Sequence, residues 1–200
     1  MKHKVFISYH HANDQWYKNE LVRWGEANDI FIDASVEMGE IPDEWDTQKI
    51  REYIRDEHLA DTTVTILLVG TQTKKRKHID WELYSSMYDG KINKKSGLLV
   101  INLPSIHCPY HTLCSPEEKA AILPNEKNWI TINERSEFES RYPYLPDRII
   151  DNLLAKDVNI SVINWSDISV SNLKLLIDKA FESRKSNRYD LSRPMKMRNS

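Results

Sequence analysis

The sequence predicts an α/β fold: a five-stranded, mostly parallel sheet with helices on both faces. Five short segments are apolar on consecutive positions, which is typical of strands buried on both faces. They recur about every 30 residues, with helix-period segments between them, as strand–helix–strand units do. The expected strands are residues 4–9, 30–33, 63–70, 97–103 and 129–132.

The expected helices follow from capping residues and apolar spacing. Asn13 and Asp14 are candidate caps of the first helix, the second begins near Asp46, and the third runs over residues 78–87. We expect the third to stop at Asp89 and Gly90, with the glycine in the left-handed conformation. The fourth helix begins at residues 146–147 and the fifth covers residues 170–181. The apolar stripes are, in order, Tyr17, Leu21 and Trp24; Ile50, Tyr53 and Ile54; Ile79, Leu83 and Met87; Ile149, Ile150 and Leu153; and Leu173, Leu176, Ile177 and Phe181.

The chain divides into a body of residues 1–182 and a basic tail of residues 183–200. Residues 104–128 contain four prolines, so this part of the body is expected to be a loop excursion without a long helix. The tail carries a net charge of +5 and few apolar residues, and we expect it to fray or dock loosely.

Composition excludes several classes of protein. The longest apolar runs are of strand length, so we expect no membrane span, and the short apolar start of the chain is no signal peptide. With two cysteines in 200 residues, a secreted disulfide scaffold is excluded and a cytoplasmic location is expected. The body carries a net charge of −7, which offers no general attraction to nucleic acid.

Ligands of open parallel sheets bind outside the carboxyl ends of the strands, so the residues that leave each strand indicate the chemistry. The glycines lie at positions 25, 39, 70, 90 and 97, which excludes the glycine pattern of a dinucleotide-binding fold and a P-loop. A receiver domain would need an aspartate where this chain has Gly70 and Thr71. Hydroxyls, an aromatic ring, imidazoles and one aspartate remain at the strand ends. Glu82, on the flank of the third helix's apolar stripe, can border a pocket, although most such glutamates only solvate a helix edge.

Three motifs resemble the TIR-like domains of the ThsB type from Thoeris anti-phage defence systems. The first covers residues 5–10 (VFISYH) and the second residues 31–35 (FIDAS). The third joins the third strand to the third helix through Gly70, Thr71, Thr73, Arg76, Trp81 and Glu82. The resemblance is closest over residues 1–103, and it implies a flavodoxin-like TIR fold for residues 1–182. One departure is His78, where family members often have an aromatic residue.

The resemblance implies that the protein cleaves NAD⁺, with Glu82 as the catalytic residue and neither a metal nor a cofactor. A carboxylate suffices for this chemistry, because nicotinamide is a good neutral leaving group and the ribosyl cation needs electrostatic stabilisation. The product implied is an ADP-ribose-derived signal, cyclic or conjugated, that activates a separate effector protein. A phage component would be the trigger.

The remaining expected site residues would hold the substrate. Tyr9 would stack on a ring, His10 and Asp33 would hold polar groups, and Ser8 and Thr71 would bind phosphate or ribose. Arg76 is singled out from the basic run 74–77 as a substrate contact. Trp81 faces away from the apolar stripe, so it is either a pocket lid or a contact with a second protomer of a homo-oligomer.

Two alternatives bear on function. A TIR domain can also act as a non-catalytic adaptor through protein–protein association, although an adaptor has no need of an acid at position 82. Four metal-ligand types crowd the excursion: His107, Cys108, His111 and Cys114. Because ligands so close in sequence seldom converge on one ion, we expect no stoichiometric zinc.

Overall fold

The computed structural model describes residues 2–35, 41–42, 44–91 and 93–200. These residues contain one sheet of five strands in the order β2-β1-β3-β4-β5, and every pair of neighbours is parallel. The strands are β1 (His3–Ser8), β2 (Phe31–Asp33), β3 (Val64–Val69), β4 (Gly97–Asn102) and β5 (Ser161–Asn164). The α/β class and the parallel sheet expected from the sequence are therefore confirmed.

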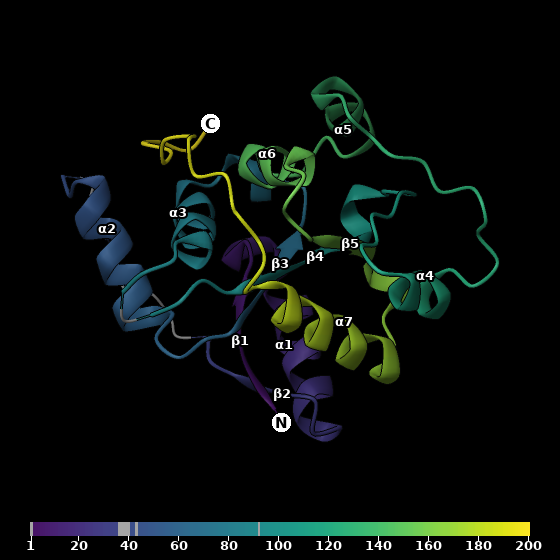
Figure 1. Ribbon diagram of the computed structural model, residues 1–200. Helices are drawn as coiled ribbons and strands as arrows, with labels where there is room; N and C mark the ends of the chain where they lie inside the picture. Colours follow the sequence, from purple (N-terminus) through teal and green to yellow (C-terminus); the bar gives the residue numbers. More distant parts are fainter. Residues whose placement is uncertain (1, 36–40, 43, 92) are drawn as a thin grey trace.

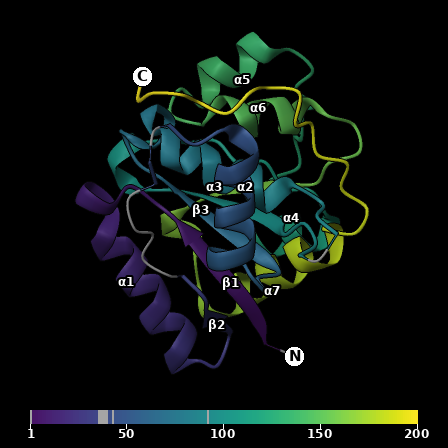
Figure 2. The same cartoon turned by 90° about the vertical axis from the view of Figure 1, so that its left-hand side faces the viewer.

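Helices cover both faces of the sheet (Figure 1, Figure 2). One face carries α1 (His11–Ala27), α4 (Pro116–Ile122) and α7 (Val170–Ser183), which pack on apolar side chains of alternate strand positions. The other carries α2 (Thr47–Tyr53), α3 (Lys77–Met87), α5 (Arg135–Arg141) and α6 (Asp147–Leu154). Alternation along each strand sends successive side chains to opposite faces. In β1, Ile7 therefore joins the first layer, and Phe6 packs under α2 and α3.

Helix α7 lies unusually close to the sheet. A Cβ atom at Gly97 would come within 1.8 Å of the Ala180 carbonyl oxygen, so no other residue fits there without moving the helix. The side of α7 that faces the sheet is completely or almost completely buried at Leu173, Leu176 and Ile177. The glycine thus fixes the separation between α7 and β4.

The fifth strand is not where the sequence predicts it. Residues 129–132 lie in an irregular segment, with Ile130 60% exposed, and β5 is Ser161–Asn164 instead. The apolar residues of the irregular segment serve other contacts: Trp129 packs against the first layer and lies under the Lys119 ammonium at 4.7 Å. An apolar run indicated burial here, but it did not indicate pairing with β4.

Two predicted helix ends also differ. Helix α1 begins at His11, and Asn13 and Asp14 lie inside it rather than capping it. Helix α3 ends at Met87 and is followed by Tyr88 in extended conformation, and no described glycine has a positive φ. The chain therefore turns away from α3 without a left-handed glycine at Gly90. The cap at Asp46 is present: its side chain accepts a hydrogen bond from the Lys49 amide at 2.8 Å.

The basic tail is docked, contrary to the loose attachment expected. It leaves α7 and crosses to the face that carries α3 and α6 (Figure 1). There Met195 is 4% exposed, and the Tyr189 hydroxyl donates a hydrogen bond to the Ser96 carbonyl at 3.0 Å. The Lys196 amide donates to Asp80 Oδ2 at 2.9 Å, and Arg193 pairs with Asp151. Composition missed this docking because main-chain groups of the tail make much of the contact.

Candidate active site at the carboxyl edge of the sheet

Most of the predicted site residues lie at the carboxyl ends of the central strands. Ser8 ends β1, Asp33 ends β2, and Thr71 follows β3. Glu82 comes from the second turn of α3, on the same sheet face as Ser8. The parallel topology therefore brings together residues from three separate motifs.

A buried pair of side chains joins the first and third motifs. The Ser8 hydroxyl donates a hydrogen bond to Glu82 Oε2 at 2.5 Å. Ser8 is 1% exposed and Glu82 5% exposed, so Glu82 is more deeply buried than a residue on the flank of a helix stripe would be. Burial raises the pKa of Glu82 to about 8, and the Ser8 hydrogen bond offsets a smaller part of this effect. The carboxyl group is therefore largely protonated at neutral pH until a positive charge approaches it.

His10 forms the next part of the edge, directly before α1. It is 6% exposed, and its Nδ1 has no hydrogen-bond partner among the residues that the structure describes. Burial lowers the pKa of His10, and the nearby positive charges of Arg76 and His11 lower it further. The imidazole is accordingly neutral at physiological pH and has a nitrogen available for a ligand.

Asp14 is a site residue that the sequence analysis treated only as a helix cap. It is 3% exposed, and its Oδ2 lacks a hydrogen-bond partner in the described part of the chain. A Cβ atom at Gly70 would lie 2.5 Å from that oxygen, so the glycine makes room for the carboxylate. Burial raises the pKa of Asp14 to about 6. Helical spacing could have found it, because Asp14 lies on the same buried face of α1 as Leu21 and Gly25.

Tyr9 and Asp33 are held by neighbouring side chains. The Tyr9 hydroxyl donates to Gln15 Oε1 at 2.8 Å, and its ring stacks on the His11 ring with centroids 4.5 Å apart. Because Tyr9 follows Ser8 in the chain, its side chain lies on the opposite sheet face, in the layer under α1. Asp33 pairs with the Lys18 ammonium at 2.9 Å and accepts a hydrogen bond from the Ser35 amide. Tyr9 thus lies on the sheet face opposite the Ser8–Glu82 pair, and Asp33 lies next to Val5 of β1, three residues before Ser8.

The structure places Trp81 away from both roles expected for it. The indole is 2% exposed and its N–H donates to the Lys196 carbonyl at 2.7 Å. It packs with Phe6, Ile50 and Met195 beneath the docked tail, so it is neither a lid over a pocket nor a surface for a second protomer. Arg76 directly precedes α3 and lies near enough to His10 to act on its pKa, and Thr71 is half-buried.

Comparison with known families decides the relationship. Residues 6–107 match the family described as Thoeris protein ThsB, TIR-like domain. The chain belongs to this family. No curated protein matches the chain in sequence. The matched range contains every site residue predicted above, from Ser8 to Glu82, and ends inside the excursion. None of the described helices combines the length and apolar character needed to cross a membrane.

Two of the four clustered ligand types of this TIR-like protein, His111 and Cys108, contact groups outside the cluster. The His111 ring nitrogen Nε2 lies 2.6 Å from Asp167 Oδ2, and the Cys108 thiol lies 3.7 Å from the Arg141 carbonyl oxygen. Burial raises the pKa of the Cys114 thiol to about 11, so the group is protonated at neutral pH and little of the thiolate that binds metals or attacks electrophiles is present. Within the described ranges, no group of three or more His, Cys, Asp or Glu residues could hold a metal ion.

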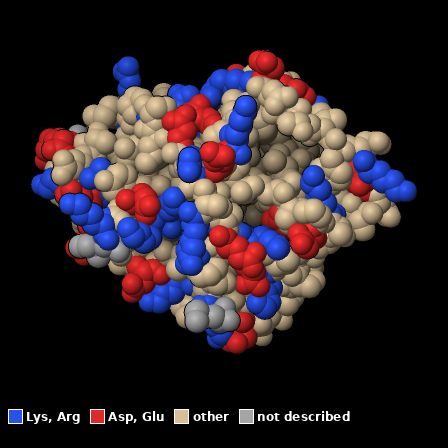
Figure 3. Space-filling model, viewed as in Figure 1, with Lys and Arg blue, Asp and Glu red and all other residues tan. Residues whose placement is uncertain are grey.

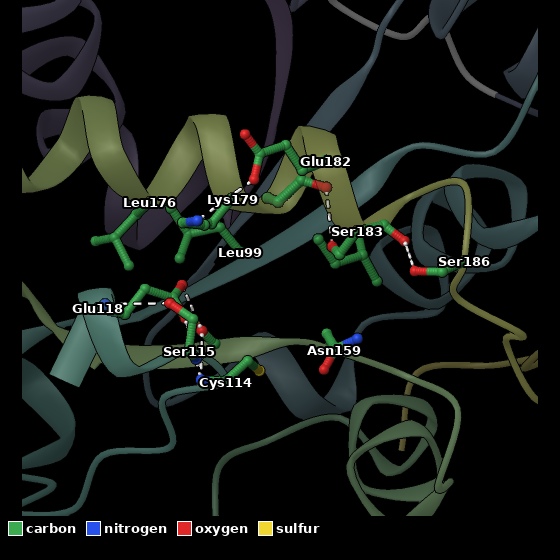
Figure 4. Close-up of a pocket in the computed structure, with 13 residues that line it drawn as sticks. Leu99, Cys114, Ser115, Glu118, Asn159, Leu176, Lys179, Glu182, Ser183 and Ser186 are labelled. Carbon is green, nitrogen blue, oxygen red and sulfur yellow. Dashed lines mark hydrogen bonds and ion pairs between the residues drawn. The ribbon is translucent and has the colours of Figure 1, made fainter.

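A pocket of about 340 Å³ lies elsewhere, between α4 and α7 at the amino ends of β4 and β5 (Figure 4); we name it the α4–α7 pocket. Its polar groups bond to one another: the Ser161 hydroxyl donates to Glu118 Oε1 at 2.8 Å, and Lys179 lies 3.4 Å from Glu182. Figure 3 shows a hollow on the face of Figure 1, with acidic and basic side chains interspersed around it. Glu82 does not line this pocket, so its volume says nothing about the candidate site.

Proposed function

We propose that this TIR-like protein cleaves NAD⁺ between nicotinamide and ribose and releases an ADP-ribose-derived signalling nucleotide. The observation that supports the proposal is a buried glutamate, Glu82, held by a serine from the first strand at the carboxyl edge of a parallel sheet. Membership of the Thoeris ThsB family supports the same reading, since a diffusible product suits a defence system with a separate effector.

In the proposed reaction the bond from ribose C1′ to the pyridinium nitrogen breaks, and its electron pair leaves with neutral nicotinamide. The remaining ribosyl cation is stabilised by the Glu82 carboxylate, worth a few kcal/mol in a site that excludes water. The positive nicotinamide ring of the bound substrate favours the ionised carboxylate, which lowers the pKa of Glu82 from its raised value in the free protein. A hydroxyl of the same molecule, a second small molecule or water then forms a bond to C1′ of the cation and releases its proton.

The other residues bind and orient the substrate in this proposal. Ser8 fixes the Glu82 carboxyl group, His10 offers a neutral imidazole nitrogen, and Arg76 supplies positive charge near the phosphates. Thr71 and Asp33 contribute hydrogen bonds to the ribose, and Tyr9 stabilises the edge from the other side of the sheet. The proposal requires no metal and no cofactor, and it places the protein in the cytoplasm with its effector and a phage component as trigger.

Glu82→Gln tests the proposal most directly. The amide keeps the shape of the side chain but removes the charge that the cation needs, so NAD⁺ consumption should fall about 100-fold, which corresponds to about 2.8 kcal/mol at 1.4 kcal/mol per decade. Purified wild-type and variant chains would be incubated with NAD⁺, with and without extract of phage-infected cells, and the products measured by mass spectrometry.

The outcomes of this experiment separate the candidate functions. Equal consumption by wild type and Glu82→Gln would remove the assignment to this residue. If neither protein consumes NAD⁺ under activating conditions, the domain acts as a non-catalytic adaptor through association with other proteins. Asn93→Ala, on the loop before β4, is a matched control that leaves the Ser8–Glu82 pair intact.

A further inference from the structure

A second cavity, of about 330 Å³, lies at the carboxyl end of β4; we name it the β4 pocket. Its walls come from three segments: Asn102 at the end of β4, residues 106–110 of the excursion, and residues 140–145, which run from the end of α5 into the loop before α6. It shares no lining residue with the α4–α7 pocket, and Glu82 does not line it. The chemistry of its walls is unused by the proposed reaction.

Asn102 provides a hydrogen-bond acceptor with no donor. The residue is 2% exposed, and its Nδ2 donates to Asn164 Oδ1 at 3.2 Å. Its Oδ1 is buried and accepts no hydrogen bond from any described residue. A buried carbonyl oxygen without a donor is costly, so such groups usually have a partner in the functional state. A ligand with an N–H group that enters the pocket would supply one.

The remaining walls combine aromatic rings and prolines with polar side chains such as His107 and Ser140. Tyr110 and Tyr142 have ring centroids 6.0 Å apart, and the Tyr142 hydroxyl is already engaged by Thr112 at 3.0 Å. The Arg141 guanidinium lies 5.0 Å over the Tyr110 ring and pairs with Glu137 at 2.7 Å, which fixes this wall. Pro109, Pro143 and Tyr144 also line the pocket. Aromatic rings and prolines present flat surfaces on which a planar ring can stack.

We propose that the β4 pocket binds a planar nitrogen heterocycle of the adenine type. The ring packs against the tyrosine and proline walls, and its amino group donates to Asn102 Oδ1. β1 and β4 are separated by β3, so the pocket lies about 10 Å to the side of Ser8, at roughly 4.8 Å per strand. Two sources share this chemistry: a free nucleoside, and the adenine end of a dinucleotide whose other end reaches Glu82. Binding requires no turnover, so the inference does not depend on the proposed function.

Titration of the full chain with adenosine, followed by calorimetry, tests the inference. Asn102→Leu removes the acceptor and should weaken adenosine binding at least tenfold. Tyr110→Ala removes a stacking wall and should weaken it by a similar factor; since Tyr110 is 40% exposed, this variant keeps the test valid if Asn102→Leu does not fold. Lys179→Ala, in the α4–α7 pocket, is the matched control and should leave the affinity unchanged.

Competition identifies the source of the ring. Adenosine would be titrated again into Glu82→Gln protein saturated with NAD⁺, which this variant is expected to consume about 100-fold more slowly than wild type. Displacement of adenosine supports the adenine end of the dinucleotide as occupant, and continued binding supports a separate nucleoside; either result upholds the pocket. The inference is overturned if wild type does not bind adenosine, or if Lys179→Ala weakens binding and the two β4-pocket variants do not.

Discussion

Asp80 and Glu82 are two buried carboxyl groups on the same helix, two residues apart, with opposite surroundings. Asp80 accepts hydrogen bonds from Arg148 at 2.9 and 3.0 Å and from the Lys196 amide. Among the residues that the structure describes, Glu82 has the Ser8 hydroxyl as its one hydrogen-bond partner, and burial raises its pKa to about 8. Both are about 5% exposed or less, so burial alone does not distinguish them. Their hydrogen-bond partners distinguish them. Asp80 belongs to a charged network that stabilises the fold, whereas Glu82 can gain or lose a proton.

The same contrast extends to the surroundings of each residue. Around Asp80, Arg148 also donates to the carbonyl oxygens of Arg193 and Pro194, so the tail completes a fully bonded network. Around the candidate site, His10 Nδ1 and Asp14 Oδ2 lack partners among the described residues. Buried polar groups without partners reduce stability, and they are typical of sites that bind a ligand.

The largest expected effect comes from breaking the hydrogen-bonded network around Asp80. Arg148→Ala removes a fully buried guanidinium and leaves Asp80 without its charge partner, which should reduce the free energy of unfolding by about 3–5 kcal/mol. Urea unfolding followed by tryptophan fluorescence measures it. Arg188→Ala, at an 82% exposed side chain, is the control and should change stability little. A loss as small as that of the control would show that the Asp80–Arg148 network does not stabilise the fold.

Removal of the tail is the next largest perturbation. Truncation after Glu182 exposes Trp81 and removes buried Met195 and half-buried Tyr189, although ordering of the tail opposes their contribution. We expect a loss of about 2 kcal/mol, or a melting temperature roughly 5 °C lower. Scanning calorimetry of the two chains checks this. An unchanged melting temperature would support the loose tail that composition predicts.

The pH dependence of NAD⁺ cleavage tests whether the carboxyl group of Glu82 changes its charge. If the carboxylate is the working form, kcat/KM for NAD⁺ should rise about tenfold per pH unit below about 8 and level off above it, because this parameter reports the free enzyme. The midpoint of kcat should be lower, because the bound cationic substrate favours ionisation. Initial rates from pH 6 to 9 test the prediction, and a flat kcat/KM profile would contradict it.

The pH dependence of stability gives a separate test of the raised Glu82 pKa. The pKa of Glu82 rises from 4.5 to about 8 on folding, so the folded protein holds a proton that the unfolded chain releases. Stability from this group is complete below about pH 4.5 and is lost as pH rises through about 8. Glu82→Gln cannot titrate, so its melting temperature relative to wild type should increase between pH 5 and 8. A constant difference across that range would show that the Glu82 pKa is not raised.

Much of the fold could be predicted from apolar runs, because a strand buried on both faces has few polar positions. The prediction for β5 was wrong, because Val162 and Ile163 are the only large apolar residues of this four-residue strand. Residues 129–132 are more apolar and therefore fit the expected pattern of a buried strand better. For the site, motif spacing indicated Glu82 and Ser8, and the structure places them in contact. Asp14 falls on the buried face of α1 by helical spacing, but an aspartate near a helix start is also a typical cap, and the cap interpretation hid its burial. The burial of Trp81 could not be predicted, because Met195 and the Lys196 carbonyl that cover it lie more than 100 residues further along the chain.

The docked tail also has a consequence for the order of folding. Trp81 acquires its hydrogen-bond partner from a segment 115 residues further along the chain, and Asp80 from one 116 residues away. Contacts between such distant segments form late and slow the overall rate. During synthesis the α3 surface that holds Trp81 is therefore apolar and uncovered until residues 187–196 have emerged, and a chaperone that recognises exposed aromatic side chains would find its target there.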